Sequence, residues 1–147
     1  MNNRIISLAL ICFIFCACES KSPSLIGTWA NTALTVNMKL PNGQDSVLSV
    51  PDGQWEAVMK FKPIQTTFAE DGSFKSKYIG LDGTLLGVEE GTWQMRNDSL
   101  ILKSGGYDFA YHVSYEGNKS RFVSLLDFNK DGTMDRYDGW QERLTEE

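Results

Sequence analysis

Apolar and polar residues alternate one by one through much of this chain, in short runs that turn-forming residues separate. In the segment 107–115, Tyr, Phe or Val occupies every second position, and Asp, Ala, His and Ser lie between them. The segment 54–62 alternates in the same way, with Trp55 and Phe61 on its apolar face. A period of two is typical of an antiparallel sheet with one face in a core and the other in water. The pattern therefore predicts an all-β protein.

Pairs of Asn, Asp and Gly recur between these runs at intervals of about 8 to 15 residues, the spacing of a strand plus a tight turn. The runs predict eight or nine strands, over 24–38, 54–62, 64–69, 73–80, 85–95, 99–103, 107–115, 121–128 and 134–144. Consecutive hairpins must protect their edges, and an antiparallel up-and-down barrel does so. A β-sandwich fits the same pattern, and periodicity alone does not separate the two.

The first eighteen residues follow a different pattern. A short polar stretch that contains Arg4 precedes an apolar run from Ile5 to Ala17, and Cys18 follows. Since a membrane-spanning helix needs roughly 20 residues, this run fits the apolar region of a secretory signal peptide better. An ordinary secretory signal that is cut nearby is one interpretation of this segment.

Residues 15–18, Phe-Cys-Ala-Cys, resemble the lipobox of bacterial lipoproteins, in which the last Cys is lipidated. The resemblance implies a signal peptide over 1–17, a lipidated Cys18 with a short tether over 18–24, and one domain over 25–147. It also implies an exported protein of the cell envelope that is attached to a membrane through the lipid on Cys18.

The charge and the cysteine content of the chain exclude several kinds of partner and site. The chain has 14 Lys and Arg against 19 Asp and Glu, and the net charge of −5 becomes about −6 when Arg4 leaves with the signal peptide. An acidic domain without a Lys/Arg cluster is a poor candidate for nucleic-acid binding. Cys12 and Cys16 lie in the signal peptide, so the domain retains neither a disulfide nor a Cys-based metal site.

Two Gly-Thr-Trp motifs, Gly27 to Trp29 and Gly91 to Trp93, resemble the Gly-x-Trp motif of lipocalins and lipocalin-like bacterial lipoproteins. The resemblance implies a lipocalin-like barrel in which Gly27, Trp29, Gly91 and Trp93 are structural. It also implies that Trp29 closes one barrel end beneath an arginine of the last strand, for which Arg143 is the candidate.

Residues 127–138 follow the twelve-residue pattern of a calcium loop, with Gly132 at the sixth position, where such a loop turns sharply. Asp138 replaces the usual bidentate Glu at position twelve, and strands are expected on both sides of the loop, so a bound Ca²⁺ would be structural. The alternative is an Asn- and Asp-rich hairpin tip without metal. The expected ligands are Asp127, Asn129, Asp131, Thr133 (through its carbonyl), Asp135 and Asp138.

No motif of a catalytic site is present in the sequence, and His112, the sole histidine, falls on the polar face of its strand. We therefore expect a non-enzymatic binding module for a small apolar or amphipathic ligand. One alternative is a filled barrel that docks an envelope partner through its surface, for example through 40–54. A weaker alternative is a hydrolase or isomerase on the same scaffold. The residues expected to line the ligand site are Tyr107, Phe109, Tyr111 and Tyr115.

Overall fold

The computed structural model describes residues 24–40 and 42–145, so the predicted signal peptide and Cys18 lie outside the described residues. Within the described part, nine strands and one short helix follow one another along the chain. They are β1 (Gly27–Lys39), β2 (Asp45–Val50), α1 (Trp55–Met59), β3 (Gln65–Phe68), β4 (Ser73–Ile79), β5 (Leu85–Arg96), β6 (Ser99–Ser104), β7 (Tyr107–Glu116), β8 (Lys119–Leu126) and β9 (Asp135–Arg143).

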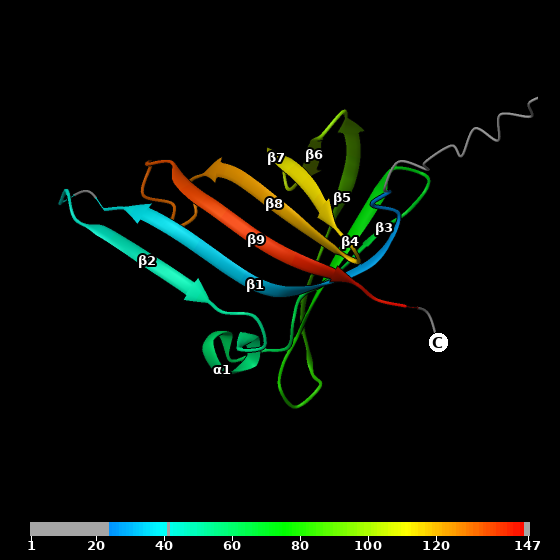
Figure 1. Cartoon of the computed structure of the whole chain (residues 1–147), viewed down its shortest axis with the longest axis horizontal. Helices are drawn as coiled ribbons and strands as arrows, with labels where there is room; N and C mark the ends of the chain where they lie inside the picture. Colours follow the sequence, from blue (N-terminus) through cyan, green and yellow to red (C-terminus); the bar gives the residue numbers. More distant parts are fainter. Residues whose placement is uncertain (1–23, 41, 146–147) are drawn as a thin grey trace, which may run out of the picture.

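Eight of these strands close into an antiparallel barrel (Figure 1). From β3 to β9 each strand pairs with the next, and β1 pairs with both β3 and β9. The β1–β9 pairing runs from Trp29↔Arg143 to Asn37↔Arg136, so the first and last strands leave no open edge between them. The two sheets of a sandwich are not joined in this way. The β-sandwich alternative is therefore excluded, and the expected antiparallel up-and-down barrel is confirmed.

Strand β2 lies outside the barrel and extends one edge of β1 (Figure 1). It pairs with the second half of β1, from Leu34↔Val50 to Lys39↔Asp45, after β3 has left that edge. None of the strands predicted from the sequence covers this segment, which lies within the connection 40–54, so β2 was missed. The sequence pattern of this strand is weak because Val50 is its one fully buried residue.

Helix α1 replaces the strand expected over 54–62, and this prediction was also wrong. The helix ends at Met59 and is capped by Lys60, whose φ of 62° is left-handed. Trp55 and Met59 are four residues apart, which places them on one face of a helical turn. Both contact the same hydrophobic cluster. Alternate apolar positions include pairs four residues apart, so this short pattern fits a helical turn as well as a strand.

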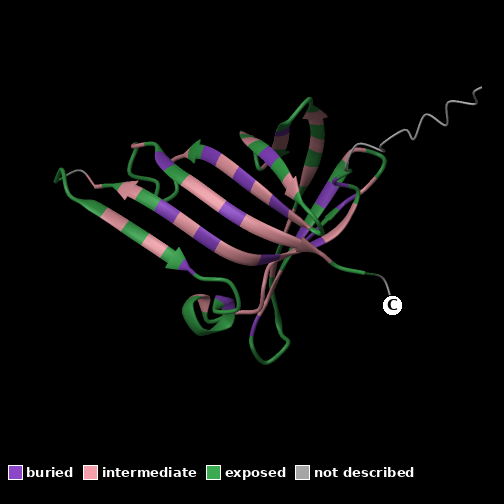
Figure 2. Cartoon of the chain, viewed as in Figure 1, coloured by how far each residue is buried: buried purple, intermediate pink, exposed green. Residues whose placement is uncertain are grey.

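Inward-facing side chains form two hydrophobic clusters that share Tyr137 as a neighbour. The alternation of buried and exposed residues along the strands is visible in Figure 2. A register shift in β1 between Asn31 and Ala33 lets Trp29 and Leu34, an odd and an even position, face the same interior. The fully buried members of the first cluster are Leu25, Trp29, Phe68, Phe74, Leu100, Val113 and Phe122, and those of the second are Leu34, Val36, Val50 and Trp55.

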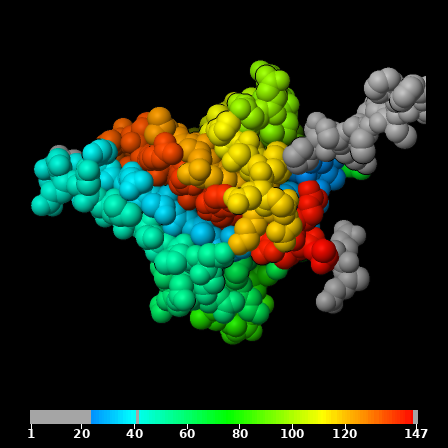
Figure 3. Space-filling view, in the orientation of Figure 1, coloured from blue at the N-terminus to red at the C-terminus, as the bar shows by residue number. Residues whose placement is uncertain are grey.

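The barrel has two different ends. We call the end at which β1 begins and β9 finishes the closed end, because Leu25, Trp29 and Arg143 cover it. We call the opposite end, which carries the turns 80–84, 105–106 and 127–134, the distal end. The β4–β5 turn projects from the body of the molecule at the lower edge of Figure 3.

Candidate ligand-binding site

A cavity of about 130 Å³ lies inside the barrel, bordered by residues of both hydrophobic clusters. Each of the eight barrel strands contributes at least one side chain to it. The cavity differs from an ordinary apolar core because more than half of its lining side chains carry polar atoms. The apolar lining is Ile64, Phe68, Phe74, Leu100, Leu102 and Phe122, and the polar lining is Asn31, Thr66, Ser76, Tyr78, Glu89, Tyr111, Tyr137 and Gln141.

Three tyrosines supply both rings and hydroxyl groups to this cavity. The rings of Tyr111 and Tyr137 meet edge to face, with centroids 5.8 Å apart. Burial raises the pKa of Tyr111 to about 12, and burial likewise raises the pKa of Tyr137. Burial, together with the nearby Glu89 carboxylate, also raises the pKa of Tyr78. All three therefore remain neutral phenols near pH 7 and can donate hydrogen bonds.

Glu89 is the one residue with a formal charge among the described residues that line the cavity. It lies on the inward face of β5, the same face as Gly91 and Trp93, and is half-buried. The Tyr78 hydroxyl donates a hydrogen bond to Glu89 Oε2 at 3.3 Å. Tyr78 and Glu89 both lie toward the distal end of their strands, so the carboxylate is held at that side of the cavity.

Other polar groups of the lining differ in how well they are paired. The hydroxyls of Thr66 and Ser76 hydrogen-bond to each other at 2.8 Å between β3 and β4. Gln141 Oε1 is buried and has no hydrogen-bond partner within the described part of the chain. An unpaired buried acceptor costs about 1–3 kcal/mol. A hydrogen-bond donor in the cavity would remove this cost.

The closed end is sealed by a tryptophan and an arginine, in the arrangement that the lipocalin resemblance implied. Trp29 is 1% exposed, and its Nε1 donates to the Leu25 carbonyl at 2.7 Å. The Arg143 guanidinium lies 4.4 Å from the Trp29 ring centroid and donates to the carbonyls of Ser24 and Ile26. Gly27 has a φ of 122°, and a Cβ there would lie 2.7 Å from Arg143 Nη1. These contacts fix the start of the domain against the end of its last strand.

Gly91 and Trp93 also have positions that account for their residue types. A Cβ at Gly91 would collide with the Lys103 carbonyl oxygen and the Phe74 ring, so β5 approaches β6 there as only glycine allows. Trp93 packs against the first cluster and its Nε1 donates to the Ala69 carbonyl at 3.0 Å. Both residues build the wall of the barrel and do not line the cavity.

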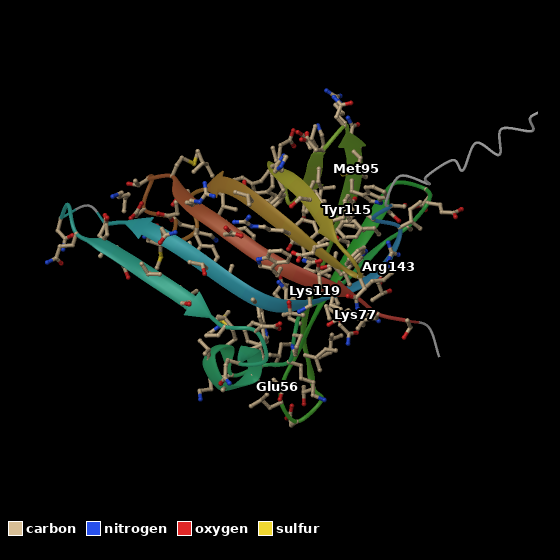
Figure 4. All side chains as sticks on the ribbon, in the orientation of Figure 1. Glu56, Lys77, Met95, Tyr115, Lys119 and Arg143 are labelled. Carbon is tan, nitrogen blue, oxygen red and sulfur yellow. The ribbon has the colours of Figure 1, made fainter. Side chains whose placement is uncertain are left out.

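The four residues expected to line a ligand site are spread along β7, and one of them reaches the cavity. Tyr111 lines it, as described above. Tyr115 lies near Met95 toward the closed end (Figure 4), in a surface depression beside Trp93. Tyr107 is 70% exposed at the distal end, with the Phe109 ring 6.4 Å from its own.

Sequence reasoning missed most of the polar lining. Asn31, Glu89 and Gln141 are polar residues on inward faces, where alternation leads one to expect apolar side chains. Glu89 lies two positions before Gly91, on the same face of the strand, and a charged residue at such a position could have indicated a polar site inside the barrel. No comparable signal existed for Tyr137, because a tyrosine in a strand is ordinary.

Where β7 and β8 separate, the barrel wall carries a second, larger groove of about 650 Å³. The pairing of these strands stops at His112↔Val123, and the Ser124 hydroxyl then bonds to the Ala110 carbonyl at 2.6 Å. Several apolar side chains with large exposed fractions line the groove, namely Tyr107, Leu125 and Met134.

The loop between β8 and β9 uses many of its oxygens to hold its own backbone. Asp127 accepts hydrogen bonds from the amides of Asp131 and Gly132, at 2.9 and 3.0 Å. Asp131 Oδ1 accepts from the Thr133 amide at 2.8 Å, and Asn129 Nδ2 donates to Asp131 Oδ2 at 2.8 Å. These are the contacts of an Asx-rich turn.

The last two expected calcium ligands are engaged elsewhere. Asp135 is fully buried and accepts from the amides of Lys39 and Phe128, at 3.1 and 3.0 Å. Asp138 faces outward on β9 and binds the Arg121 guanidinium through both oxygens, at 2.8 and 2.5 Å. Within 24–40 and 42–145, no three His, Cys, Asp or Glu side chains are grouped to hold a metal ion. Calcium binding stays a prediction from the sequence.

Among the described residues, no helix is both long enough and apolar enough to cross a membrane. The proposed lipidation site, Cys18, lies outside those residues.

No protein-family model matches the chain, and no curated protein matches it. Among solved structures, the chain is similar to the siderocalin Ex-FABP, which is described as functioning through dual ligand specificities. The two share 16% sequence identity with a TM-score of 0.48, over 84% of this chain and 76% of the siderocalin. The barrel itself is defined by its own strand pairing.

Proposed function

We propose that this protein is a non-catalytic binding module that holds one small amphipathic ligand inside its barrel, and that a lipid on Cys18 anchors it to a membrane. The observation that carries the first part is the cavity itself, which combines aromatic rings with polar groups that the fold leaves incompletely paired. An ordinary barrel core would bury apolar side chains there, because buried polar groups without partners are costly.

The size of the cavity limits the ligand. A cavity of about 150 Å³ is known to hold one benzene molecule. A space of about 130 Å³ therefore suits a ligand with one ring or a short aliphatic chain. Glu89 and Tyr78 are half-buried toward the distal end, which makes that side the natural route of entry.

A matched pair of substitutions on β6 tests this proposal. Leu100 lines the cavity and is 1% exposed, whereas its neighbour Ile101 faces away from the cavity. The probes are neutral, cationic and anionic single-ring compounds, and NMR titration measures their binding. We expect Leu100→Phe to fill the cavity and weaken binding at least about tenfold, whereas Ile101→Phe leaves binding unchanged. If no probe binds, or if both variants bind equally well, the interior is not a ligand site.

A filled barrel that docks a partner through its surface is the second candidate. The β4–β5 hairpin favours it, because four of its apolar side chains are 44–61% exposed where the turn projects from the body (Figure 3). Scattered single apolar residues are normal at protein surfaces, but a group on one hairpin is a typical feature of interaction sites. These residues are Leu81, Leu85, Leu86 and Val88.

A further inference from the structure

We infer that the ligand of the interior cavity is a small organic cation, an ammonium compound with an apolar body, and that Glu89 and the surrounding tyrosine rings recognise its charge. This inference rests on the proposed function, because it assigns a ligand class to the same site. It follows from the charge, the rings and the unpaired acceptor that the cavity presents.

The charge of the cavity is negative and uncompensated. Glu89 is the sole charged group of the described lining, and none of the ion pairs among the described residues includes it. The next residue, Glu90, faces outward and pairs with Lys75 at 2.5 Å. Alternation along β5 thus gives one carboxylate a cationic partner and directs the other, unpaired, toward the interior.

Arg143, whose guanidinium covers the closed end of the barrel, does not compensate this charge. Its guanidinium lies over Trp29 and donates to the carbonyls of Ser24 and Ile26. It is therefore committed to sealing the closed end, and it does not line the cavity. A cation brought by a ligand would supply the charge that the protein does not.

The rings around the carboxylate suit the same ligand. Tyr78, Tyr111 and Tyr137 line the cavity, and Tyr111 and Tyr137 are packed edge to face. Faces of aromatic rings attract ammonium groups, by about 0.5–1 kcal/mol at exposed sites and about 2 kcal/mol or more where water is excluded. Several rings together with one carboxylate form a site that distinguishes a cation from a neutral molecule of the same shape.

The unpaired acceptor points to a ligand with hydrogen-bond donors. Gln141 Oε1 is buried without a partner, and a hydrogen-bond donor on the ligand would satisfy it. A carboxylate or phosphate ligand has no N–H to offer and would lie beside Glu89, where like charges repel. A purely apolar ligand would leave Gln141 Oε1 without a partner and would add none for Glu89 beside the Tyr78 hydroxyl, at the cost of desolvating both groups.

Three probes of nearly equal shape test the inference on the protein as it is purified from membranes in detergent. Benzylammonium, benzyl alcohol and benzoate differ mainly in charge, and isothermal titration calorimetry gives their dissociation constants. We expect benzylammonium to bind at least about tenfold more tightly than benzyl alcohol, and benzoate to bind more weakly still. Glu89→Gln should abolish the preference for benzylammonium over benzyl alcohol, with benzyl alcohol binding retained.

Glu90→Gln is the matched control, since it removes the neighbouring carboxylate from the outer face and should leave the preference unchanged. Gln141→Leu is a second variant, and it should weaken benzylammonium more than benzyl alcohol. Equal binding of the three probes, or a preference that survives Glu89→Gln, would overturn the ammonium inference while the binding module stands. Failure of all three probes to bind the wild-type protein would overturn both proposals.

Discussion

Glu89 and Glu90 illustrate how much one step along a strand decides at the scale of single residues. Glu90 points to solvent and pairs with Lys75, whereas Glu89 points inward and accepts a hydrogen bond from Tyr78. Two residues of the same type thus face solvent and a cavity respectively. The exposed pair contributes little, because such ion pairs are typically worth about 0–1 kcal/mol. The inward carboxylate of Glu89 is therefore the one that we expect to contribute to ligand binding.

The raised pKa of Tyr111 predicts that the protein loses stability at alkaline pH. Its pKa is raised to about 12 in the folded protein, chiefly by burial, with smaller effects of Glu89 and Tyr78, against about 10 in an unfolded chain. Between pH 10 and 12 the unfolded state binds fewer protons than the native state, so the free energy of unfolding falls as the pH rises. Tyr78 and Tyr137, whose pKa values are also raised, add to this fall.

Urea unfolding at pH 8 and at steps from pH 10 to 12 measures this loss of stability. Tyr111→Phe should reduce the slope of stability against pH in that range, because one raised group has been removed. Tyr107→Phe is the control, since Tyr107 is 70% exposed. An identical slope in wild type and Tyr111→Phe would show that the Tyr111 proton is not retained in the native state.

At the scale of elements, the loop between β8 and β9 accommodates two interpretations of the same residues. Its carboxylates accept hydrogen bonds from backbone amides, which explains a stable loop without metal. As the twelfth residue of the calcium pattern, Asp138 would have to leave Arg121 before it joined the other ligands.

The calcium hypothesis predicts that adding Ca²⁺ to chelator-treated protein raises its melting temperature, because an ion that binds only the native state stabilises it by mass action. Asp131→Asn should abolish this rise. Asp71→Asn, in the β3–β4 turn, is the control, because Asp71 accepts from the Ser73 amide in a similar turn outside the loop. Equal melting temperatures with Ca²⁺ and with chelator would leave the loop as an Asx-rich hairpin connection.

At the scale of the whole molecule, the described chain begins at the closed end. Ser24 is held there by Arg143, and five residues separate Cys18 from Ser24. Such a segment spans at most about 20 Å. A lipid on Cys18 would therefore bring the closed end toward the membrane and leave the distal end, with the proposed entry to the cavity, facing away from it.

Cys18→Ala tests the anchor. The variant should fail to incorporate labelled palmitate and should move from the membrane fraction to the soluble fraction, since the acyl chains supply the membrane affinity. Cys16→Ala is the control within the proposed signal peptide and should still be lipidated. If Cys18→Ala still takes up the label and stays with membranes, the lipobox interpretation is wrong.

Much of the architecture was predictable because it depends on local patterns. Seven of the predicted strands lie within a few residues of β3 to β9, since alternation and Asn/Asp-Gly turns act over short distances. The Trp29–Arg143 contact was expected from the lipocalin resemblance, although the two residues are 114 positions apart in the sequence. Segment 54–62 was misassigned because its pattern fits both a strand and a helical turn, and burial against the second cluster decided between them.

The sequence by itself determined the class of fold, the turns and which face of most strands is apolar, because these depend on neighbours a few residues apart. Tertiary structure alone decided that β1 pairs with β9 and thereby closes the barrel, because that pairing joins segments about a hundred residues apart. Closure also brought Tyr78, Glu89, Tyr111, Tyr137 and Gln141 around one cavity. Each of them lies on a different strand except for the two on β9, so the site exists only after the eight strands have met.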